Sequence, residues 1–326
     1  MASVASRQHS RRSPGGFLAG SSSWLFLLPT VFFFVLWQLW PILQVAWISL
    51  TDYRFLAPDT PTIGIHLWRF HFTLPTNFVG VDNYREALKD PLVRKGLLRA
   101  LGFTAIFVPG MIMFPMILAV MIDRITNNRV ATFYRLILLI PAMIPGPLIF
   151  VLWRLMYSLY IGPINYFLVD VTHQYTVANQ PQWLGSPHLV FFSLAIMEWW
   201  WGLGYHTMFF LAGLATIPRD LPEAARLDGA NEWKLFWNIT VPRLFPIILV
   251  LVVLRFGTAM AIIDEYLIMG GFDRTRPTYT WTMRMFELAF VAGDWRQGYA
   301  SAIGWIGAIA MLIVVAGMFY VFRSRD

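Results

Sequence analysis

The chain has 326 residues, of which 57% are hydrophobic and 13% charged, and its formal net charge is +7. Its mean hydropathy is +0.57, too apolar for a soluble domain, so the composition predicts an integral membrane protein. The lack of cysteine excludes disulfides, thiolate metal sites and a cysteine nucleophile. Basic residues are spread over many loops, which favours membrane flanks over a surface for nucleic acid.

Membrane-spanning stretches occupy most of the sequence after a polar start. Residues 1–23 are basic and rich in serine and glycine, so we expect a disordered tail before a membrane domain over 24–326. About 20 apolar residues cross the hydrocarbon core as a helix. Six stretches meet this length, which predicts an all-α membrane protein with six spans. They are 24–50, 97–122, 133–157, 188–212, 243–268 and 299–322.

Two segments between the spans are predicted to contain short helices. Residues 82–96 form an amphipathic pattern broken at Pro91, which is typical of a helix lying along the membrane interface. The segment 158–187 contains "GPINYFL", a second short helix candidate. Six spans place both termini on one side of the membrane, but the lysine and arginine counts of the loops do not decide which side.

The segment 213–242 is polar although apolar spans lie on both sides of it. Asp220 is expected to cap a helix whose first turn tolerates the proline that follows shortly after. Gly229 fits the left-handed position that ends a helix, and Asn231 fits the cap of the next one. The pattern therefore predicts two short helices at a fixed angle.

The second of these helices is expected to run to about Thr240 and to end at Pro242. Its apolar face, formed by Trp233, Phe236 and Trp237, is expected to hold it to the bundle. The first helix is narrow because it carries two consecutive alanines, so another protein surface can approach it closely.

Ionisable residues within spans are costly and are therefore functional candidates. Glu198 lies in the middle of the fourth span, and helical spacing places Trp201, Gly202 and Tyr205 on the same face. A carboxylate, two aromatic rings and a gap left by glycine suit a sugar. The competing interpretation is ordinary packing, which we expect for the neighbouring Trp199 and Trp200. Arg255, Ala259 and Ile262 likewise share a face of the fifth span, whereas Asp264 points nearly opposite.

A resemblance to a known family rests on motifs spread along the chain. The pattern Glu223-Ala224-Ala225, then Asp228-Gly229-Ala230, Ile239 and Pro242, resembles the EAA loop in the transmembrane subunits of binding-protein-dependent ABC importers. Within that family the chain is similar to the carbohydrate branch, the maltose and glycerol-phosphate type of permease. Further matches are Trp40-Pro41 through "SLTDY" (49–53), Phe78, Gly80, Asn83 and Tyr84, Gly162 and Asn165, "LAGLATIPRDLPEAARLDGA" (211–230) and "YASA" (299–302). One departure is "MGGFDRTRP" (269–277), where the family often has a Gly-Gly-Pro turn.

The resemblance implies a type I importer permease core in the cytoplasmic membrane, with both termini cytoplasmic. It implies that a cytoplasmic coupling loop, about 213–242, docks on an ATPase subunit. The coupling residues would be Glu223, Ala224, Ala225, Asp228 and Gly229. Expected partners are a second permease subunit, two ATPase subunits, an extracytoplasmic solute-binding protein and membrane lipid, with no nucleic acid.

The chain itself is expected to be no enzyme and to hold no metal or cofactor. None of its three lysines (89, 95 and 234) follows a glycine, so it lacks the phosphate-binding loop of nucleotidases, and ATP with its magnesium would be bound by the partner ATPase subunits.

In the family the fourth and fifth spans border the translocation path, so Arg255 is placed to face Glu198. Two interpretations stay open, a structural ion pair and a polar pair that contacts substrate. The substrate-path candidates are Glu198, Trp201, Gly202, Tyr205, Arg255 and Ala259.

The prediction is a permease subunit that imports a carbohydrate or related polyol by alternating access. A stand-alone secondary transporter or channel is the alternative, but we find no internal repeat that would favour it. A membrane-embedded enzyme would need convergent histidines or carboxylates, which the six histidines do not supply.

Overall fold

The computed structural model describes residues 18–55, 62–67, 70–75, 77–218, 220–293 and 295–323. Most of the predicted disordered tail, residues 1–17, lies outside these ranges. The helix α1 (Leu18–Phe34) already begins at Leu18, so the prediction of disorder was wrong for 18–23. Helix extension adds one hydrogen bond per residue once a nucleus exists, which lets the long apolar helix continue outward through "AGSSS".

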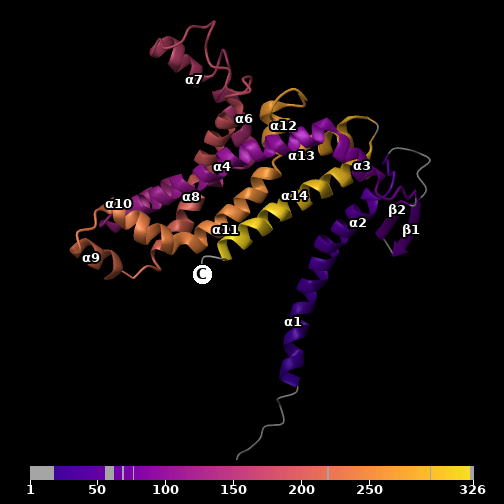
Figure 1. Ribbon diagram of the computed structural model, residues 1–326, viewed down its shortest axis with the longest axis horizontal. Coiled ribbons are helices and arrows are strands. Elements are labelled where there is room, and N and C mark those ends of the chain that lie inside the picture. Colours follow the sequence, from indigo (N-terminus) through magenta and orange to yellow (C-terminus); the bar gives the residue numbers. More distant parts are fainter. Residues whose placement is uncertain are drawn as a thin grey trace, which may run out of the picture.

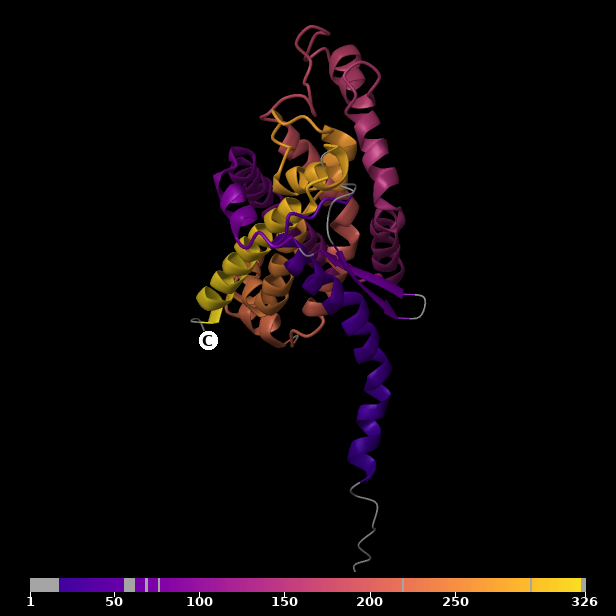
Figure 2. The same ribbon diagram turned by 90° about the vertical axis from the view of Figure 1, so that its right-hand side faces the viewer.

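The N-terminal helices form an arm that leaves the rest of the molecule. After α1 come a π-helical turn, η1 (Val35–Leu39), and α2 (Trp40–Ser49). Phe26–Ser49 is long and apolar enough to cross a membrane, and 0% of its most apolar window is buried inside the chain. Figures 1 and 2 both show α1 directed away from the other helices. Its apolar surface therefore faces lipid or another protein.

A short β-hairpin, which the sequence analysis did not predict, follows the arm in a chain whose other described elements are helical. The strands β1 (Thr62–Leu67) and β2 (Phe70–Pro75) pair antiparallel, with Thr62 opposite Pro75. Both strands are rich in β-branched and aromatic residues, which favour an extended backbone. The Trp47 indole donates a hydrogen bond to the Pro75 carbonyl (2.8 Å), which fixes the hairpin to α2.

The predicted break at Pro91 separates α3 (Asp82–Lys89) from α4 (Pro91–Asp123). The Asp90 carboxylate accepts a hydrogen bond from the Leu92 amide (2.8 Å), so Asp90 caps α4 and the proline takes its first position. Arg296 holds α3 with two hydrogen bonds to the Glu86 carboxylate, 2.8 and 2.7 Å long. These bonds and the guanidinium charge hold the pKa of Glu86 below its ordinary value, although burial opposes the shift.

The third expected span is divided rather than continuous. It consists of α5 (Asn128–Leu139), a 3₁₀ turn η2 (Pro141–Met143) and α6 (Gly146–Met156). Prolines at 141, 145 and 147 lack an amide hydrogen, so the segment "IPAMIPGP" breaks the helix. The short helix predicted at "GPINYFL" is present as α7 (Pro163–Tyr166) and the π turn η3 (Phe167–Val171).

The core lies where α4 packs along α8 (Val190–Leu214), with α11 (Val241–Met260) beside them. Fully buried side chains from α4 and α8 fill this contact; they are Phe103, Phe107, Met111, Leu194, Met197 and Phe210. On another side α8 crosses α5 with backbones in contact. An ideal Cβ on Gly204 would lie only 1.9 Å from the Leu138 carbonyl oxygen, so only glycine allows this approach.

The polar segment after α8 folds as α9 (Asp220–Leu227) and α10 (Glu232–Leu235). The expectation that the second helix ends at Pro242 was wrong. A π turn, η4 (Phe236–Thr240), continues α10 into α11, so a single helical stretch runs over Glu232–Met260. Pro242 lies inside this stretch, just after the π turn, so its missing amide hydrogen falls where the helical hydrogen-bond pattern changes. The span expected over 243–268 thus ends earlier, and α12 (Asp264–Gly270) is separate.

The C-terminal part contains α13 (Trp281–Phe286), the π turn η5 (Glu287–Val291) and α14 (Gln297–Arg323). Arg99 of α4 reaches the loop before α13 and donates to the carbonyl oxygens of Arg274, Thr275 and Tyr279. Four helical stretches of the described chain are long and apolar enough to cross a membrane: Phe26–Ser49, Pro91–Asp123, Glu232–Met260 and Gln297–Val321.

Candidate functional site

The hairpin of α9 and α10 has the turn chemistry that its sequence predicts. Gly229 adopts a φ of +83°, the left-handed conformation expected at the end of α9. The Asn231 side chain accepts a hydrogen bond from the Lys234 amide (2.9 Å) and caps α10. An added Cβ at Gly229 would meet nothing within 4 Å, so the backbone conformation alone requires glycine.

One carboxylate joins the hairpin to the end of α4. Glu232 forms ion pairs with Arg226 of α9 (3.2 Å) and with Arg124, the C-cap residue directly after α4. All three side chains are about half exposed, so each pair alone contributes little to stability. Because both arginines bind the same carboxylate, the three side chains nevertheless connect α4, α9 and α10 at one point.

The outer surface of the hairpin is exposed. Glu223, Ala224, Asp228 and Gly229 are exposed, and Ala225 is half-buried. The adjacent Leu227 is 90% exposed. The predicted coupling residues thus lie on a surface that a partner can reach, and Figure 1 places α9 and α10 together at one end of the molecule.

The predicted anchor of α10 is confirmed at Phe236 but is wrong for the two tryptophans. Leu235 is buried and Phe236 packs against the core, whereas Trp233 is 70% exposed and Trp237 is 43% exposed. The two tryptophans contact each other edge to face, with ring centroids 5.7 Å apart. Leu235 and Phe236 therefore hold this helix to the bundle, and the tryptophan pair lies at its surface.

The candidate residues on α8 have different surroundings. Glu198 is buried, and the Trp201 indole donates to the Ile144 carbonyl (3.2 Å). Tyr205 is 48% exposed. The gap expected at Gly202 is filled, because an added Cβ would lie 2.9 Å from the Met111 side chain. Trp199 packs as expected and donates to a carbonyl of α4 (2.9 Å).

Glu198 has charged neighbours on two other helices. Arg255 of α11 and Glu265 of α12 both act electrostatically on it. Within the described chain, Glu198 and Arg255 form no ion pair as close as 4.0 Å, and one Glu198 carboxylate oxygen has no hydrogen-bond partner. Ala259 is fully buried one turn after Arg255.

Two neighbours of Glu198 were missed in the sequence analysis as path candidates. Glu265 and Tyr266 follow the end of α11, and the buried Tyr266 hydroxyl has no hydrogen-bond partner. The buried His206 bonds to the Gly202 carbonyl through Nδ1 (2.7 Å), while its Nε2 has no partner. The sequence "DEY" at 264–266 was the available signal, but it was interpreted as part of a span rather than as the start of a new helix.

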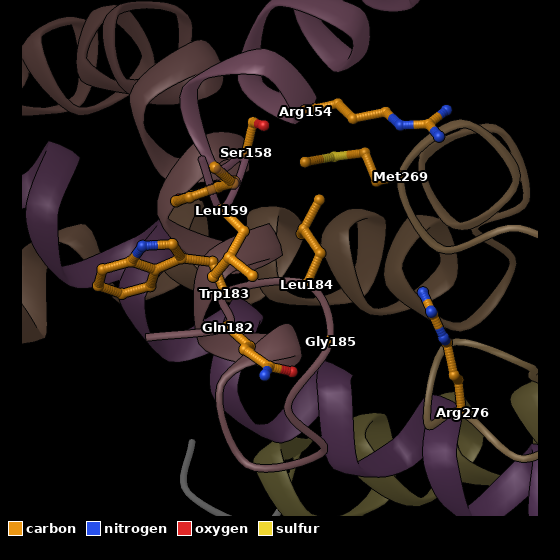
Figure 3. A pocket seen from close by; sticks show the side chains of 10 residues that line it. Arg154, Ser158, Leu159, Gln182, Trp183, Leu184, Gly185, Met269 and Arg276 are labelled. Carbon is orange, nitrogen blue, oxygen red and sulfur yellow. The ribbon is translucent and has the colours of Figure 1, made fainter. Parts of the chain in front are cut away.

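A separate cavity of about 350 Å³ lies between α6, α12 and the loop before α8. Figure 3 shows Arg154, Met269 and Arg276 along one side of it and Trp183 and Leu159 along the other. Arg154 donates to the Ile268 carbonyl (2.9 Å), so its guanidinium holds α12 against α6. The described residues contain no cluster of three histidines or carboxylates that would hold a metal ion.

The fold and the exposed hairpin define a membrane transport protein of the permease class. Residues 111–325 match the family described as "Binding-protein-dependent transport system inner membrane component", and the chain belongs to this family.

Three permease proteins are similar in sequence to this chain over most of its length. The chain is 27% identical over 290 residues to the probable ABC transporter permease protein YurN of Bacillus subtilis, covering 89% of this chain and 91% of YurN. It is 29% identical over 280 residues to the trehalose/maltose transport system permease protein MalF of Thermococcus litoralis, covering 86% and 87%. It is 25% identical over 301 residues to the sn-glycerol-3-phosphate transport system permease protein UgpA of Pectobacterium atrosepticum, covering 90% and 91%.

Solved structures share the fold. A bacterial ABC transporter that imports the acidic polysaccharide alginate matches with a TM-score of 0.74 at 20% identity, covering 94% of this chain and 96% of that one. The same type of transporter in complex with an alginate pentasaccharide-bound periplasmic protein matches with a TM-score of 0.76, covering 95% and 98%.

Proposed function

We propose that this chain is the permease subunit of an ATP-driven importer that carries a carbohydrate or related polyol across the cytoplasmic membrane by alternating access. Membership of the binding-protein-dependent family supports the transport function, and the names of the relatives from Thermococcus and Pectobacterium support the substrate class. The observation that carries the proposal is the exposed hairpin of α9 and α10, which bears the EAA pattern around a left-handed Gly229.

The proposed assembly contains a second permease subunit, two ATPase subunits and an extracytoplasmic solute-binding protein. The arm formed by α1 and α2 supports a second membrane chain, because its apolar surface has little cover from its own bundle. A similar fold occurs in a complex with a periplasmic protein, which supports the binding protein. ATP and magnesium are assigned to the ATPase subunits. Six spans, cytoplasmic termini and a cytoplasmic hairpin complete the proposal.

In the proposed mechanism the ATPase subunits close on ATP and move the hairpin. Glu223, Ala224, Ala225, Asp228 and Gly229 contact the ATPase surface. The movement then passes to α4 through Glu232 and to α11 through the continuous helix, which switches the bundle from inward-facing to outward-facing. The binding protein supplies the solute, and no covalent chemistry occurs on this chain.

The coupling role is tested with Gly229→Asp in the assembled importer. Gly293→Asp is a matched control, because Gly293 has a φ of +82° and also has nothing within 4 Å of an added Cβ. Gly229→Asp should insert normally and permit ATP hydrolysis while uptake falls. The control should retain uptake. Unimpaired uptake by Gly229→Asp would exclude the docking role.

The proposed substrate path is lined by Glu198, Trp201, Gly202, Tyr205, Arg255 and Ala259. Glu198→Gln and Arg255→Gln separate the two roles of the charged pair. Altered substrate affinity at normal expression supports contact with substrate, whereas loss of folding in both variants supports a structural pair. The solute is identified from the ligand of the binding protein that captures this permease.

The alternative of a stand-alone secondary transporter or channel is not favoured, because the family match covers residues 111–325. Uptake by the purified chain alone, in vesicles without an ATPase, would overturn the importer proposal.

A further inference from the structure

Two cavities meet beside the hairpin of α9 and α10. One is polar and measures about 650 Å³, and the other is an apolar groove of about 330 Å³. Both volumes fall in the range of sites for small ligands. Val120, Arg124 and Glu232 line both, so the two spaces adjoin each other across these three residues. Figure 1 shows α10 beside the end of α4, where this site lies.

The polar cavity carries more cations than anions. Arg124, Arg135 and Arg226 line it together with the carboxylates of Asp123 and Glu232. Glu232 already pairs with both Arg124 and Arg226. The third arginine, on α5, is left as the cation available to a ligand.

The Arg135 guanidinium has an Nε without a partner among the described residues. Its Nε is buried without a hydrogen bond, and no ion pair is formed to it among the residues that the structure describes. A buried donor without an acceptor is costly, and arginine binds phosphate oxygens with several aligned N–H groups. A phosphate group in the cavity would supply the missing acceptor.

The apolar groove has the lining expected for a hydrocarbon chain. Its walls come from the last turns of α4 and from α10 and η4, and the apolar residues are Met113, Met116, Ile117, Val120, Met121, Trp233, Phe236 and Trp237. Flexible methionines fit irregular apolar partners, and tryptophan favours the level of lipid headgroups. The two tryptophans and Met121, which is 59% exposed, leave the groove open to a lipid.

The site lies at the C-terminal end of Pro91–Asp123 and at the N-terminal end of Glu232–Met260, two stretches that are long and apolar enough to cross a membrane. A ligand that fills both spaces there has an anionic head and an apolar tail. We propose that the site binds an anionic phospholipid, with its phosphate at Arg135 and an acyl chain against Trp233 and Trp237. The bound lipid joins α5 to the hairpin that Glu232 already joins to α4.

Native mass spectrometry of the full chain in dodecyl maltoside tests the headgroup contact, with added dioleoyl phosphatidylglycerol or dioleoyl phosphatidylcholine. The wild-type chain should prefer phosphatidylglycerol. Arg135→Gln should weaken that lipid about fivefold, the change expected for one basic residue near an anionic lipid surface. Arg135→Lys should retain most of the preference. Arg129→Gln is the matched control, because Arg129 is exposed on the same helix and lines neither cavity.

Tryptophan fluorescence tests the acyl contact without altering Arg135. Phosphatidylglycerol with brominated chains should quench the wild-type chain more than brominated phosphatidylcholine does, and this difference should shrink in a Trp233→Phe, Trp237→Phe double variant. The proposal would be overturned if the wild-type chain showed no preference for phosphatidylglycerol. It would also be overturned if Arg135→Gln and Arg129→Gln lost equal affinity for that lipid. Displacement of the lipid by millimolar inorganic phosphate would also overturn it, in favour of a site for free anions.

Discussion

Two glycine-to-alanine substitutions should change stability in opposite directions, although their chemistry is identical. Gly204 lies in α8 against the backbone of α5, where an added Cβ would stand 1.9 Å from the Leu138 carbonyl oxygen and 2.3 Å from its carbon. Gly257 lies in α11, where an added Cβ would meet nothing within 4 Å. Both glycines lie within helices, so the higher helix propensity of alanine should stabilise the folded state by the same amount at each position, about 1 kcal/mol.

The size of the stability loss expected for Gly204→Ala follows from the steric clash between the added Cβ and the backbone of α5. An ordinary contact of 3.4 Å requires α5 and α8 to separate by about 1.5 Å, and neither neighbouring atom can turn away because both belong to the backbone. Overpacking of this kind costs about 3 kcal/mol, which leaves a net loss of about 2 kcal/mol after the helix-propensity gain. At about 2 °C per kcal/mol for a chain of this size, Tm should fall by about 4 °C.

Thermal unfolding of the purified chain in one detergent is the assay. Gly204→Ala should lower Tm and Gly257→Ala should raise it by about 2 °C. Equal shifts for the two variants, in either direction, would refute the inference that α8 and α5 touch through their backbones at Gly204.

Three further outcomes are expected. Glu86→Gln should lower Tm at neutral pH, and the difference should shrink as the pH falls below 4.5, because Arg296 lowers the pKa of the folded carboxyl and its stabilisation requires the ionised form. Asn231→Ala should remove about 1 kcal/mol from α10 and accelerate hydrogen exchange of its first-turn amides about fivefold, without affecting α8. Arg99→Gln should leave three carbonyl oxygens without their donor, and the loop before α13 should be cleaved at least fivefold faster in limited proteolysis.

Local backbone chemistry explains why parts of the fold could be predicted. Gly229, Asn231 and the break before Pro91 each depend on the conformation of one or two residues, so their sequence signals are direct. The divided third span and the π turn at Phe236–Thr240 depend on how several prolines and a neighbouring helix are accommodated together, and hydropathy does not report this.

The charge contacts could not be predicted for a different reason. Glu232 meets Arg124, which lies 108 positions earlier in the chain, and neither residue belongs to a motif. Leu235 rather than Trp233 is buried, because the face of α10 that packs depends on how the hairpin lies against α4, and hydrophobicity alone does not fix that placement. Glu265 was interpreted as part of a span because the end of α11 at Met260 has no proline or polar run to mark it.

The helical stretch from Glu232 to Met260 contains no loop, so a tilt at one end of it also displaces the other end. Arg255 lies 23 residues along it from Glu232, about 35 Å at the usual rise. A tilt of about 5° around one end of this part of the stretch displaces its other end by about 3 Å, which is comparable to the donor–acceptor distance of a hydrogen bond. A small rotation imposed on α10 therefore reaches the level of Arg255 through one continuous helical stretch, in which the π turn at Phe236–Thr240 and Pro246 are the points where bending would reduce the displacement.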